Sequence, residues 1–459
     1  METSSENGFM DLGIAPKLLQ ILQGAGYTTP TPIQKQAIPT ALEGKDVMGI
    51  AQTGTGKTLA FGVPMLQRLV QQKDGGGLVI LPTRELAVQV EESLHKIGRP
   101  LGLKTAVLIG GEPMQKQLRV LRTQPHVLIA TPGRLLDHLE QKSVKLNNVS
   151  ILVLDEADRM LDMGFAPQIT KILQQVPKTR QTMLFSATMP DAIVNIARTY
   201  MQLPVRIEVA RPGTAAKQIE QELFFVSRDQ KLALLKKILS DYRGSILVFT
   251  RTKHGAKKVA RSVRGFGESS NEIHSNRSLS QRREALEGFK RGKYRVLIAT
   301  DIAARGIDVT GIAVVINYDL PDNAEDYVHR IGRTGRAAMS GKAISFATPD
   351  QRRDVKDIER LIRMQLPVAT KPELAHVEEI RDPRDDREFR TPYGRSPRPY
   401  APRAHSFSRQ PQKSFGTPSF SENKSNPARQ PRDGSFTPSP KKRFGTFRQR
   451  PPSRPAKRY

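Results

Sequence analysis

The feature that most constrains the fold is a series of short apolar runs, rich in β-branched residues, that alternate with segments of helical periodicity. Near-continuous apolar strands between helices are typical of parallel sheets that are buried on both faces. The runs fall into two series, which predicts two α/β domains. The predicted strands are Asp46–Ala51, Leu78–Leu81, Ala106–Ile109, Val127–Ala130, Ile151–Leu154 and Thr182–Phe185 in the first series, and Glu222–Val226, Ser245–Phe249, Arg295–Ala299, Ala313–Asn317 and Lys342–Phe346 in the second.

A short segment that contains Pro212 and Gly213 separates the two series and has the composition of a linker. The charged residues after the last strand show helical spacing around Val355–Leu366, which fits either a closing helix of the second domain or the start of a tail. The predicted boundaries are 1–209 for domain 1, 210–216 for the linker, 217–365 for domain 2, 366–388 for an extension of undefined structure and 389–459 for a tail.

The tail over residues 389–459 differs sharply from the rest of the chain. It carries 17 Lys and Arg against two acidic residues, and it contains no Leu, Ile, Val or Met. Without aliphatic side chains it cannot bury enough apolar surface to offset the entropy of ordering, which predicts disorder. Aromatic residues interleaved with arginine, as in Arg443–Arg448, favour an arm that attracts RNA, because cations bind phosphates and rings stack on bases. The alternative is a tail that serves only solubility.

Charge and composition narrow the class of protein further. The 459 residues have a formal net charge of +28, which favours a polyanionic partner. The absence of cysteine excludes disulfide scaffolds, Cys-ligated zinc, iron–sulfur clusters and thiol nucleophiles. No apolar run approaches the ~20 residues that span a bilayer, and the first residues lack the pattern of a signal peptide. We therefore expect a cytoplasmic protein without a membrane partner.

A phosphate-binding loop is predicted at Ala51–Thr58, whose sequence AQTGTGKT matches GxxxxGK(S/T) with alanine in the first position. It follows an apolar strand and precedes the helical pattern Leu59–Val70, which is the context that the motif requires. The loop amides and the helix N-terminus favour phosphate. Lys57 would reach the β- and γ-phosphates, and the Thr58 hydroxyl would bind Mg²⁺.

A second motif, the acidic segment Asp155–Asp158, directly follows the apolar run Ile151–Leu154. A carboxylate at the end of a buried strand in a phosphate-loop protein is the expected second anchor for Mg²⁺, here Asp155 acting through water. The neighbouring Glu156 is placed to orient and deprotonate an attacking water.

The ordered set of motifs resembles the DEAD-box RNA helicases of superfamily 2, over residues 9–350. In detail it is most similar to the bacterial RhlE-type branch. The resemblance implies two tandem RecA-like parallel-sheet domains, ATP and Mg²⁺ as ligands, and RNA as the partner. The matching segments are Gly26–Gln34 with Phe9 upstream, Pro82–Leu86, Gly110–Gly111, Thr131–Arg134, Asp155–Asp158, Ser186–Thr188, Val248–Thr252, Ala299–Asp308 and His329–Arg336.

The resemblance implies an ATP site that both domains complete. Gln34 would bind the adenine edge, because an amide pairs with a donor and an acceptor at once. Phe9 or Tyr27 would stack on the base, although each could instead belong to the core. Arg333 and Arg336 would be arginine fingers that reach the γ-phosphate when the domains close. The implied nucleotide-binding residues are Phe9, Tyr27, Gln34, Thr53, Gly54, Thr55, Gly56, Lys57, Thr58, Gly306 and Asp308 (which would bind the ribose), and the catalytic ones are Lys57, Asp155, Glu156, Arg333 and Arg336.

The resemblance also implies RNA contacts that do not read sequence, since threonine, arginine and glycine amides suit phosphate and 2′-hydroxyl oxygens. The residues are Pro82, Thr83, Arg84, Gly110, Gly111, Thr131, Pro132, Gly133, Arg134, Arg251, Thr252, Thr300 and Asp301. Asp158, Ser186, Thr188 and His329 would couple the ATP site to domain closure.

Two positions depart from the family pattern. Leu279 stands where the family often has glutamine, three residues before a retained Arg282, and Ser275 follows His274 where glycine is common. These departures bear on a local RNA contact of domain 2.

The function that this sequence favours is an ATP-dependent RNA helicase that unwinds or remodels RNA locally. The alternatives are an RNA chaperone or scaffold dominated by the basic tail, and a DNA-directed translocase.

Overall fold

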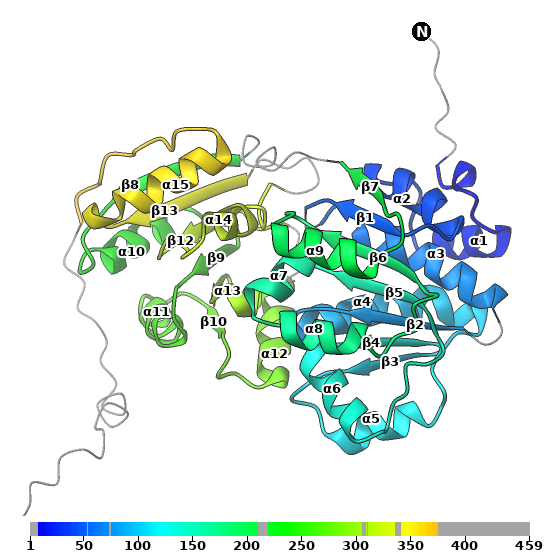
Figure 1. The fold of residues 1–459 in the computed structure, drawn as a ribbon. Helices are drawn as coiled ribbons and strands as arrows, with labels where there is room; N and C mark the ends of the chain where they lie inside the picture. Colours follow the sequence, from blue (N-terminus) through cyan, green and yellow to red (C-terminus); the bar gives the residue numbers. More distant parts are fainter. Residues whose placement is uncertain are drawn as a thin grey trace, which may run out of the picture. The chain divides into compact units, whose positions relative to one another are not determined.

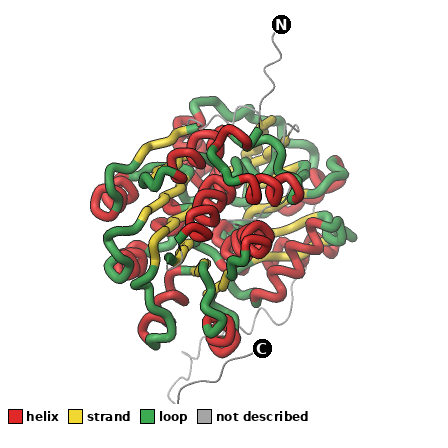
Figure 2. The backbone as a smooth tube through the Cα atoms, turned by 90° about the vertical axis from the view of Figure 1, so that its right-hand side faces the viewer, coloured by secondary structure: helices red, strands yellow, loops and turns green. Residues whose placement is uncertain are grey.

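The computed structural model describes residues 8–52, 54–72, 75–209, 219–304, 309, 311–335 and 341–374. The described part forms two α/β domains, each built around its own parallel sheet (Figure 1). Figure 2 shows the strands, in yellow, flanked by helices in red. Within the described residues, no helix is long and apolar enough to cross a membrane.

Domain 1 has a seven-stranded sheet in the order β3-β4-β2-β5-β6-β1-β7, and every neighbouring pair is parallel. Its strands are β1 (Val47–Ile50), β2 (Gly76–Ile80), β3 (Thr105–Leu108), β4 (Val127–Ala130), β5 (Val149–Asp155), β6 (Gln181–Ser186) and β7 (Val205–Glu208). Its helices are η1 (Met10–Leu12), α1 (Pro16–Gly24), α2 (Pro32–Leu42), α3 (Lys57–Gln71), α4 (Arg84–Gly98), η2 (Arg99–Leu101), α5 (Met114–Leu121), α6 (Pro132–Glu140), α7 (Ala157–Asp162), α8 (Ala166–Leu173) and α9 (Asp191–Tyr200).

The central strands of domain 1 are buried on both faces, as the continuous apolar runs predict. On β5, Ile151 and Val153 pack into one apolar cluster, whereas Leu152 and Leu154 pack into another. Because successive side chains of a strand point to opposite faces, the two clusters lie on opposite sides of the sheet.

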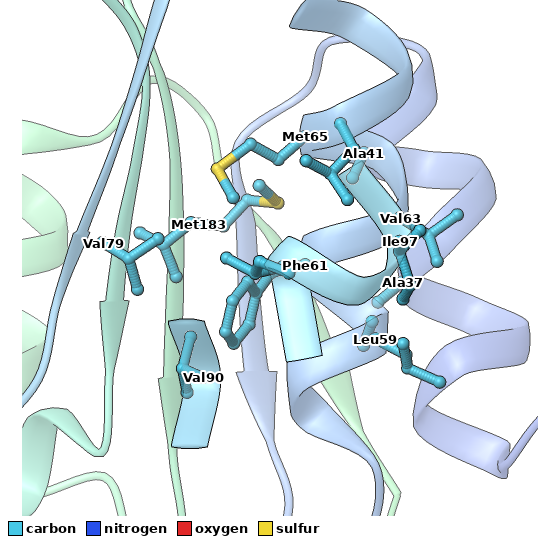
Figure 3. Packing of buried hydrophobic residues seen from close by; sticks show 14 of the residues in the cluster. Ala37, Ala41, Leu59, Phe61, Val63, Met65, Val79, Val90, Ile97 and Met183 are labelled. Atoms are coloured by element: carbon cyan, nitrogen blue, oxygen red, sulfur yellow. The ribbon is translucent and has the colours of Figure 1, made fainter. Parts of the chain in front are cut away.

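Helix α3 contributes the fully buried ring of Phe61 to the first of these clusters. Figure 3 shows Phe61 of α3 among Val79, Val90 and Met183, and its centroid lies 5.6 Å from that of Phe185. This packing fixes α3, and with it the loop that precedes the helix, against β2 and β6 of the sheet.

Domain 2 has a six-stranded sheet in the order β10-β11-β9-β12-β13-β8, again with parallel neighbours throughout. Its strands are β8 (Ile219–Phe225), β9 (Ile246–Phe249), β10 (Ser270–Ile273), β11 (Val296–Ala299), β12 (Val314–Asn317) and β13 (Gly341–Ala347). Its helices are α10 (Lys231–Asp241), α11 (Lys253–Gly265), α12 (Leu279–Lys290), α13 (Asp301–Ala304), α14 (Ala324–Ile331), η4 (Pro349–Gln351) and α15 (Arg352–Ile362). The expectation of two parallel-sheet domains is therefore confirmed.

Two strands, β7 and β10, are missing from the series of apolar runs, so the predicted strand list was incomplete. Both lie at an edge of their sheet. In β7 only Ile207 is buried, and β10 places the polar Ser270 and Glu272 inside. With so few buried apolar side chains, these two strands lack the continuous apolar run that identifies the others.

The segment after β13 resolves the two interpretations of Val355–Leu366. It forms α15, a closing helix whose Val355, Ile358 and Ile362 pack into a core cluster of domain 2 together with Leu366. The chain then runs beside β8: the Leu223 amide donates to the Pro367 carbonyl at 2.9 Å, and the Ala369 amide donates to the Leu223 carbonyl at 2.8 Å. Residues 375–388 of the predicted extension, the tail 389–459 and the linker 210–216 lie outside the described residues.

Candidate functional site

The predicted phosphate loop joins β1 to α3. Gly56 is the N-terminal cap of α3 with φ +88°, a conformation that favours glycine. Lys57 is only 6% exposed, and its Nζ donates to the carbonyl of Ala51 at 3.1 Å. The lysine is therefore folded back across its own loop, where a phosphate could replace the carbonyl as acceptor.

Gln34 connects the N-terminal motif to this loop. Its Oε1 accepts from the Thr31 amide at 2.9 Å in a capping box that begins α2, and its Nε2 donates to the Gly56 carbonyl at 2.9 Å. A Cβ on Gly56 would overlap Nε2, so the close approach requires glycine there. Gln34 thus holds the Gly26–Gln34 segment against the phosphate loop, and one proton and one lone pair of its amide remain for a ligand.

The acidic motif begins where β5 ends. Asp155 is 3% exposed, and its Oδ1 accepts the Glu156 amide at 3.0 Å. Glu156 has φ +52°, an uncommon conformation for a residue other than glycine, and is the residue immediately before α7. The turn directs two buried carboxylates into one region at the carboxyl edge of the sheet.

These two carboxyl groups differ in proton affinity. Burial raises the pKa of Asp155 to about 6, although the positive charge of Lys57 opposes this. Burial alone would raise the pKa of Glu156 too, but the charges of Arg159, Lys57 and Arg333 together lower it to about 2. Glu156 is therefore ionised at neutral pH.

Arg159 is a site residue that the sequence interpretation missed. It is 1% exposed, and its Nη1 lies 2.7 Å from Glu156 Oε2. The three-residue spacing across the start of α7 was the available signal, since it brings the residue before a helix close to the first turn. Arg159 holds the Glu156 carboxylate in one orientation.

Asp158 links the acidic motif to Ser186–Thr188. Its Oδ2 accepts from the Ala187 amide at 3.0 Å, the Thr188 amide at 2.9 Å and the Thr188 hydroxyl at 3.0 Å. Its own amide donates to Ser186 Oγ at 3.1 Å. The segment at the end of β6 cannot move without disturbing the acidic motif.

The three motifs of domain 1 line one cavity of about 380 Å³. Phe9 and Tyr27 border it, and both also pack against the apolar core of domain 1. Helix α4 supplies a wall that was not predicted, which includes Gln89 and Ser93. The full lining is Phe9, Tyr27, Thr29, Thr31, Gln34, Gly54, Gly56, Lys57, Thr58, Leu59, Leu86, Gln89, Val90, Ser93, Asp155 and Glu156.

Residues of domain 2 lie close to Arg159, the partner of Glu156. Arg333 is 3% exposed, and its positive charge contributes to the lowered pKa of Glu156. His329 precedes it by one helical turn; burial, and then the charge of Arg159, lower the pKa of this imidazole. Arg159, His329 and Arg333 line one very small cavity together.

A buried ion pair supports this part of domain 2. Arg330 is 2% exposed and binds Asp301 through two contacts, Nε to Oδ1 at 2.6 Å and Nη2 to Oδ2 at 2.7 Å. Its guanidinium also lies 5.0 Å from the centre of the Phe249 ring. Asp301, which was predicted to contact RNA, is therefore held by Arg330 through both of its oxygens.

Comparison with known proteins decides the family. Residues 31–196 match the family model described as DEAD/DEAH box helicase, and residues 230–338 match that of the helicase conserved C-terminal domain. The DEAD-box ATP-dependent RNA helicase CshA of Bacillus cereus is 43% identical over 360 residues, which cover 78% of this chain and 69% of that protein. This chain belongs to the DEAD-box RNA helicase family. The ATP-dependent rRNA helicase RRP3 of Debaryomyces hansenii is 43% identical over 399 residues, which cover 84% of each protein.

Solved structures agree with this assignment. Dbp5 of Saccharomyces cerevisiae, bound to RNA and ADP BeF3, is 29% identical with a TM-score of 0.72, over 79% of this DEAD-box chain and 95% of that one. Mss116p, bound to single-stranded RNA and AMP-PNP, is 26% identical with a TM-score of 0.73, over 80% of this chain and 79% of that one. The predicted RecA-like fold and family are confirmed; the RhlE-type branch stays a prediction.

In this DEAD-box helicase, the first-domain motifs that were predicted to contact RNA lie against one another. Thr83 caps α4 by accepting the Leu86 amide at 3.3 Å. The Arg84 guanidinium packs on the Gly110–Gly111 backbone so closely that a Cβ on Gly111 would overlap it. Arg134 donates to the Glu112 carbonyl at 2.9 Å and so joins Thr131–Arg134 to the same group.

The second-domain RNA motifs of the DEAD-box chain lie at the carboxyl ends of β9 and β11. Thr252 caps α11 by accepting the Gly255 amide at 3.0 Å, and the Arg251 guanidinium donates to the Leu320 carbonyl at 3.2 Å. Both residues border a cavity of about 640 Å³ in domain 2. Thr300 follows β11 directly. Four predicted ATP-site residues lie outside the described residues of this helicase: Thr53, Gly306, Asp308 and Arg336.

Proposed function

We propose that this chain is an ATP-dependent RNA helicase that unwinds or remodels RNA locally through RNA-stimulated ATP hydrolysis. The observation that carries the proposal is that Arg333 of domain 2 lines a small cavity together with Arg159, the ion-pair partner of Glu156 in domain 1. A hydrolytic site divided between two domains is complete only when they are closed. Binding of ATP and RNA to the closed arrangement would therefore drive closure, and hydrolysis would reverse it.

ATP would bind in the cavity of domain 1. The amides of the phosphate loop and Lys57 would hold the phosphates, and Gln34 would pair with the adenine edge, with Phe9 or Tyr27 against the base. The position of Gln34 supports this, because its amide already contacts the loop that receives the phosphates. Thr53, Gly306, Asp308 and Arg336 stay predictions for the same ligand.

The residues present fit Mg²⁺. Thr58 and Asp155 border the same cavity, and hydroxyl and carboxylate oxygens are the ligands that this ion prefers. We propose that Thr58 would hold the ion and that Asp155 would hold it through water. When bound, Mg²⁺ neutralises charge on the β- and γ-phosphates.

Hydrolysis would depend mainly on positioning. A carboxylate with a pKa near 2 is a weak base, so Glu156, fixed by Arg159, would orient the attacking water more than it would remove the proton early. This suits phosphoryl transfer, whose transition state is loose and needs little covalent help. Arg333 would stabilise the charge on the transferred phosphoryl group.

We propose that Asp158 couples hydrolysis to RNA release. Its hydrogen bonds to Ala187 and Thr188 support this role, because a shift of the acidic motif would displace the end of β6. His329 would take part from domain 2, since it lines one small cavity with Arg159, the partner of Glu156.

The basic tail 389–459 would add a second, weaker hold on RNA. Its composition supports this, with a net charge of +15 and aromatic residues between the arginines. Such a tether raises the local concentration of RNA near the two domains without requiring a defined tail structure. Protein partners are not implied, and a cytoplasmic location stays a prediction from the sequence.

The proposal is tested by comparing nucleic acids as activators. Single-stranded RNA should stimulate phosphate release by the full chain, whereas DNA of the same sequence should not, because the predicted contacts include the 2′-hydroxyl. A short RNA duplex should be separated only with ATP. Equal stimulation by DNA would favour a translocase on DNA, and strand separation without ATP hydrolysis would favour an RNA chaperone.

The RNA contact of domain 1 yields a specific prediction at Gly111. In Gly111→Ala the new Cβ would overlap the Arg84 guanidinium and displace it. Loss of one charge-assisted contact should raise the RNA concentration for half-maximal ATPase activity about 10–100-fold. The measurement is ATPase rate against RNA concentration.

Gly102→Ala is the matched control for this prediction. Gly102 has the same left-handed backbone, φ +82° against +81° for Gly111, but nothing lies within 4 Å of its Cβ position. Both variants suffer similar backbone strain, so only Gly111→Ala should weaken RNA activation. Equal effects of the two variants would show that strain, and not Arg84, is responsible.

A further inference from the structure

Leu279, which departs from the family pattern, contacts the apolar core of the other domain. Leu279 begins α12 of domain 2, yet it is 6% exposed and belongs to an apolar cluster of domain 1. All other members of that cluster, within the described residues, lie between Phe9 and Val209. A side chain from domain 2 therefore completes the apolar surface of domain 1.

A buried ion pair lies on the same face of α12. Arg282 is 9% exposed, and its Nη2 pairs with Oε1 of Glu85, an 8% exposed residue in the first turn of α4 in domain 1. Residues three apart on a helix point the same way, so Leu279 and Arg282 meet domain 1 together.

The start of α12 is fixed in the orientation that this contact needs. Ser278 and Gln281 form a capping box: the Ser278 amide donates to Gln281 Oε1 at 3.0 Å, and the Gln281 amide donates to Ser278 Oγ at 3.3 Å. Arg283 extends the contact, since it borders a cavity of about 300 Å³ together with Glu91 and Glu92 of α4. Arg283 of domain 2 is positively charged, whereas Glu91 and Glu92 of domain 1 are negatively charged.

We propose that Glu85, Leu279 and Arg282 form an interdomain clasp that stabilises the closed arrangement directly, so that position 279 acts on domain closure and not on RNA. This inference rests on the proposed function, in which closure brings Arg333 to Glu156. Burial of a leucine side chain is sufficient to shift such an equilibrium by about one to two factors of ten. The ion pair gives the contact its register, because separating one buried charge from its partner is costly.

The clasp can be tested by fluorescence energy transfer, for which this cysteine-free chain is well suited. Gln141→Cys in domain 1 and Lys290→Cys in domain 2 place one dye on each domain at exposed positions. Closure is then measured against RNA concentration with a non-hydrolysable ATP analogue. RNA binding with ADP is measured in parallel.

The expected result is that Leu279→Gln raises the RNA concentration for half-maximal closure about tenfold or more. Leu279→Met, which preserves an apolar side chain, should change it by less than about twofold. RNA affinity with ADP should not change. In ATPase assays, Leu279→Gln should raise KM for RNA while kcat at saturating RNA stays within about twofold. Glu85→Gln provides a second variant that weakens the same contact through the ion pair.

Two results would overturn the clasp. One is unchanged closure in both Leu279→Gln and Glu85→Gln. The other is an equal loss of RNA affinity with ADP and with the ATP analogue, which would make position 279 a direct RNA contact. Failure of the unsubstituted chain to close with ATP analogue and RNA would instead contradict the proposed function, so the two failures are distinguishable. Thermal unfolding of each variant confirms that it is folded.

Discussion

Replacing Glu156 with glutamine should lower RNA-stimulated ATP hydrolysis by about 10²–10⁴-fold while ATP still binds. The substitution preserves the volume of the side chain and removes its charge. In the folded protein that charge is buried at 3% exposure and held by Arg159 at 2.7 Å. An amide in the same place neither orients the attacking water as an ionised carboxylate does nor balances the charges of Arg159 and Arg333. Phosphate release at saturating RNA measures the loss.

The control for this prediction is Glu140→Gln, which makes the same chemical change at an exposed position of domain 1. It should leave the rate within about twofold, since surface substitutions away from a site have small effects. Binding of a fluorescent ATP analogue and thermal unfolding are measured for both variants. If Glu156→Gln retained hydrolysis close to the unsubstituted rate, the carboxylate would not be the group that positions water. Loss of nucleotide binding together with hydrolysis would indicate a structural role for the pair with Arg159.

Replacing Arg333 with alanine should reduce the RNA-stimulated rate by about 10³-fold or more, the effect typical of an arginine finger. The reason is positional: Arg333 is on domain 2, it is 3% exposed, and it lines a small cavity with Arg159, which pairs with Glu156 on domain 1. The variant should still bind ATP, because the nucleotide cavity is lined by residues of domain 1. Single-turnover hydrolysis with bound RNA separates the chemical step from binding.

Two further variants sharpen this prediction. Arg353→Ala removes an exposed arginine of the same domain and should leave the rate within about twofold. Arg333→Lys retains the charge but not the planar fork, so its rate should lie between those of the alanine variant and the unsubstituted protein. A full rate for Arg333→Ala would contradict the role of Arg333 as a finger.

The parts of the site that could be predicted from the sequence are those determined by neighbours along the chain. Lys57 follows its glycines directly, and Asp155 ends its own apolar strand. In both segments, the residue that carries the chemistry lies within a few positions of the residues that determine the local backbone structure. Parallel strands then bring the two segments to one edge of the sheet, because all carboxyl ends of such a sheet lie on the same side.

The parts that could not be predicted depend on contacts between distant residues. The sequence gives no sign that Asp301, the first residue of α13, is bound through both of its oxygens by Arg330. In the sequence, Leu279 indicates only that a polar side chain common in the family is absent. The packing of α12 shows that this leucine contacts the apolar surface of domain 1. No local pattern specifies such partners, since they are set by the way in which two elements come together.

A related limit applies to two of the four edge strands, β7 and β10. Central strands such as β5 are identified by continuous apolar residues, whereas β7 and β10 bury few apolar side chains. Buried polar groups make β10 harder still to recognise. Glu272 is 1% exposed and is held by Arg277, and a glutamate in a short segment ordinarily indicates a surface loop.

The short segment Pro367–Ala369 has a consequence for how chains of this protein behave together. It forms two backbone hydrogen bonds to Leu223 along the outer side of β8, the last strand of its sheet. An uncovered outer strand offers its amides and carbonyls as a template for strands of other molecules. A shortened protein that ends before residue 367 would expose that template and favour aggregation. One that ends after Ala369 would retain the cover, and with it the solubility of an isolated helicase core.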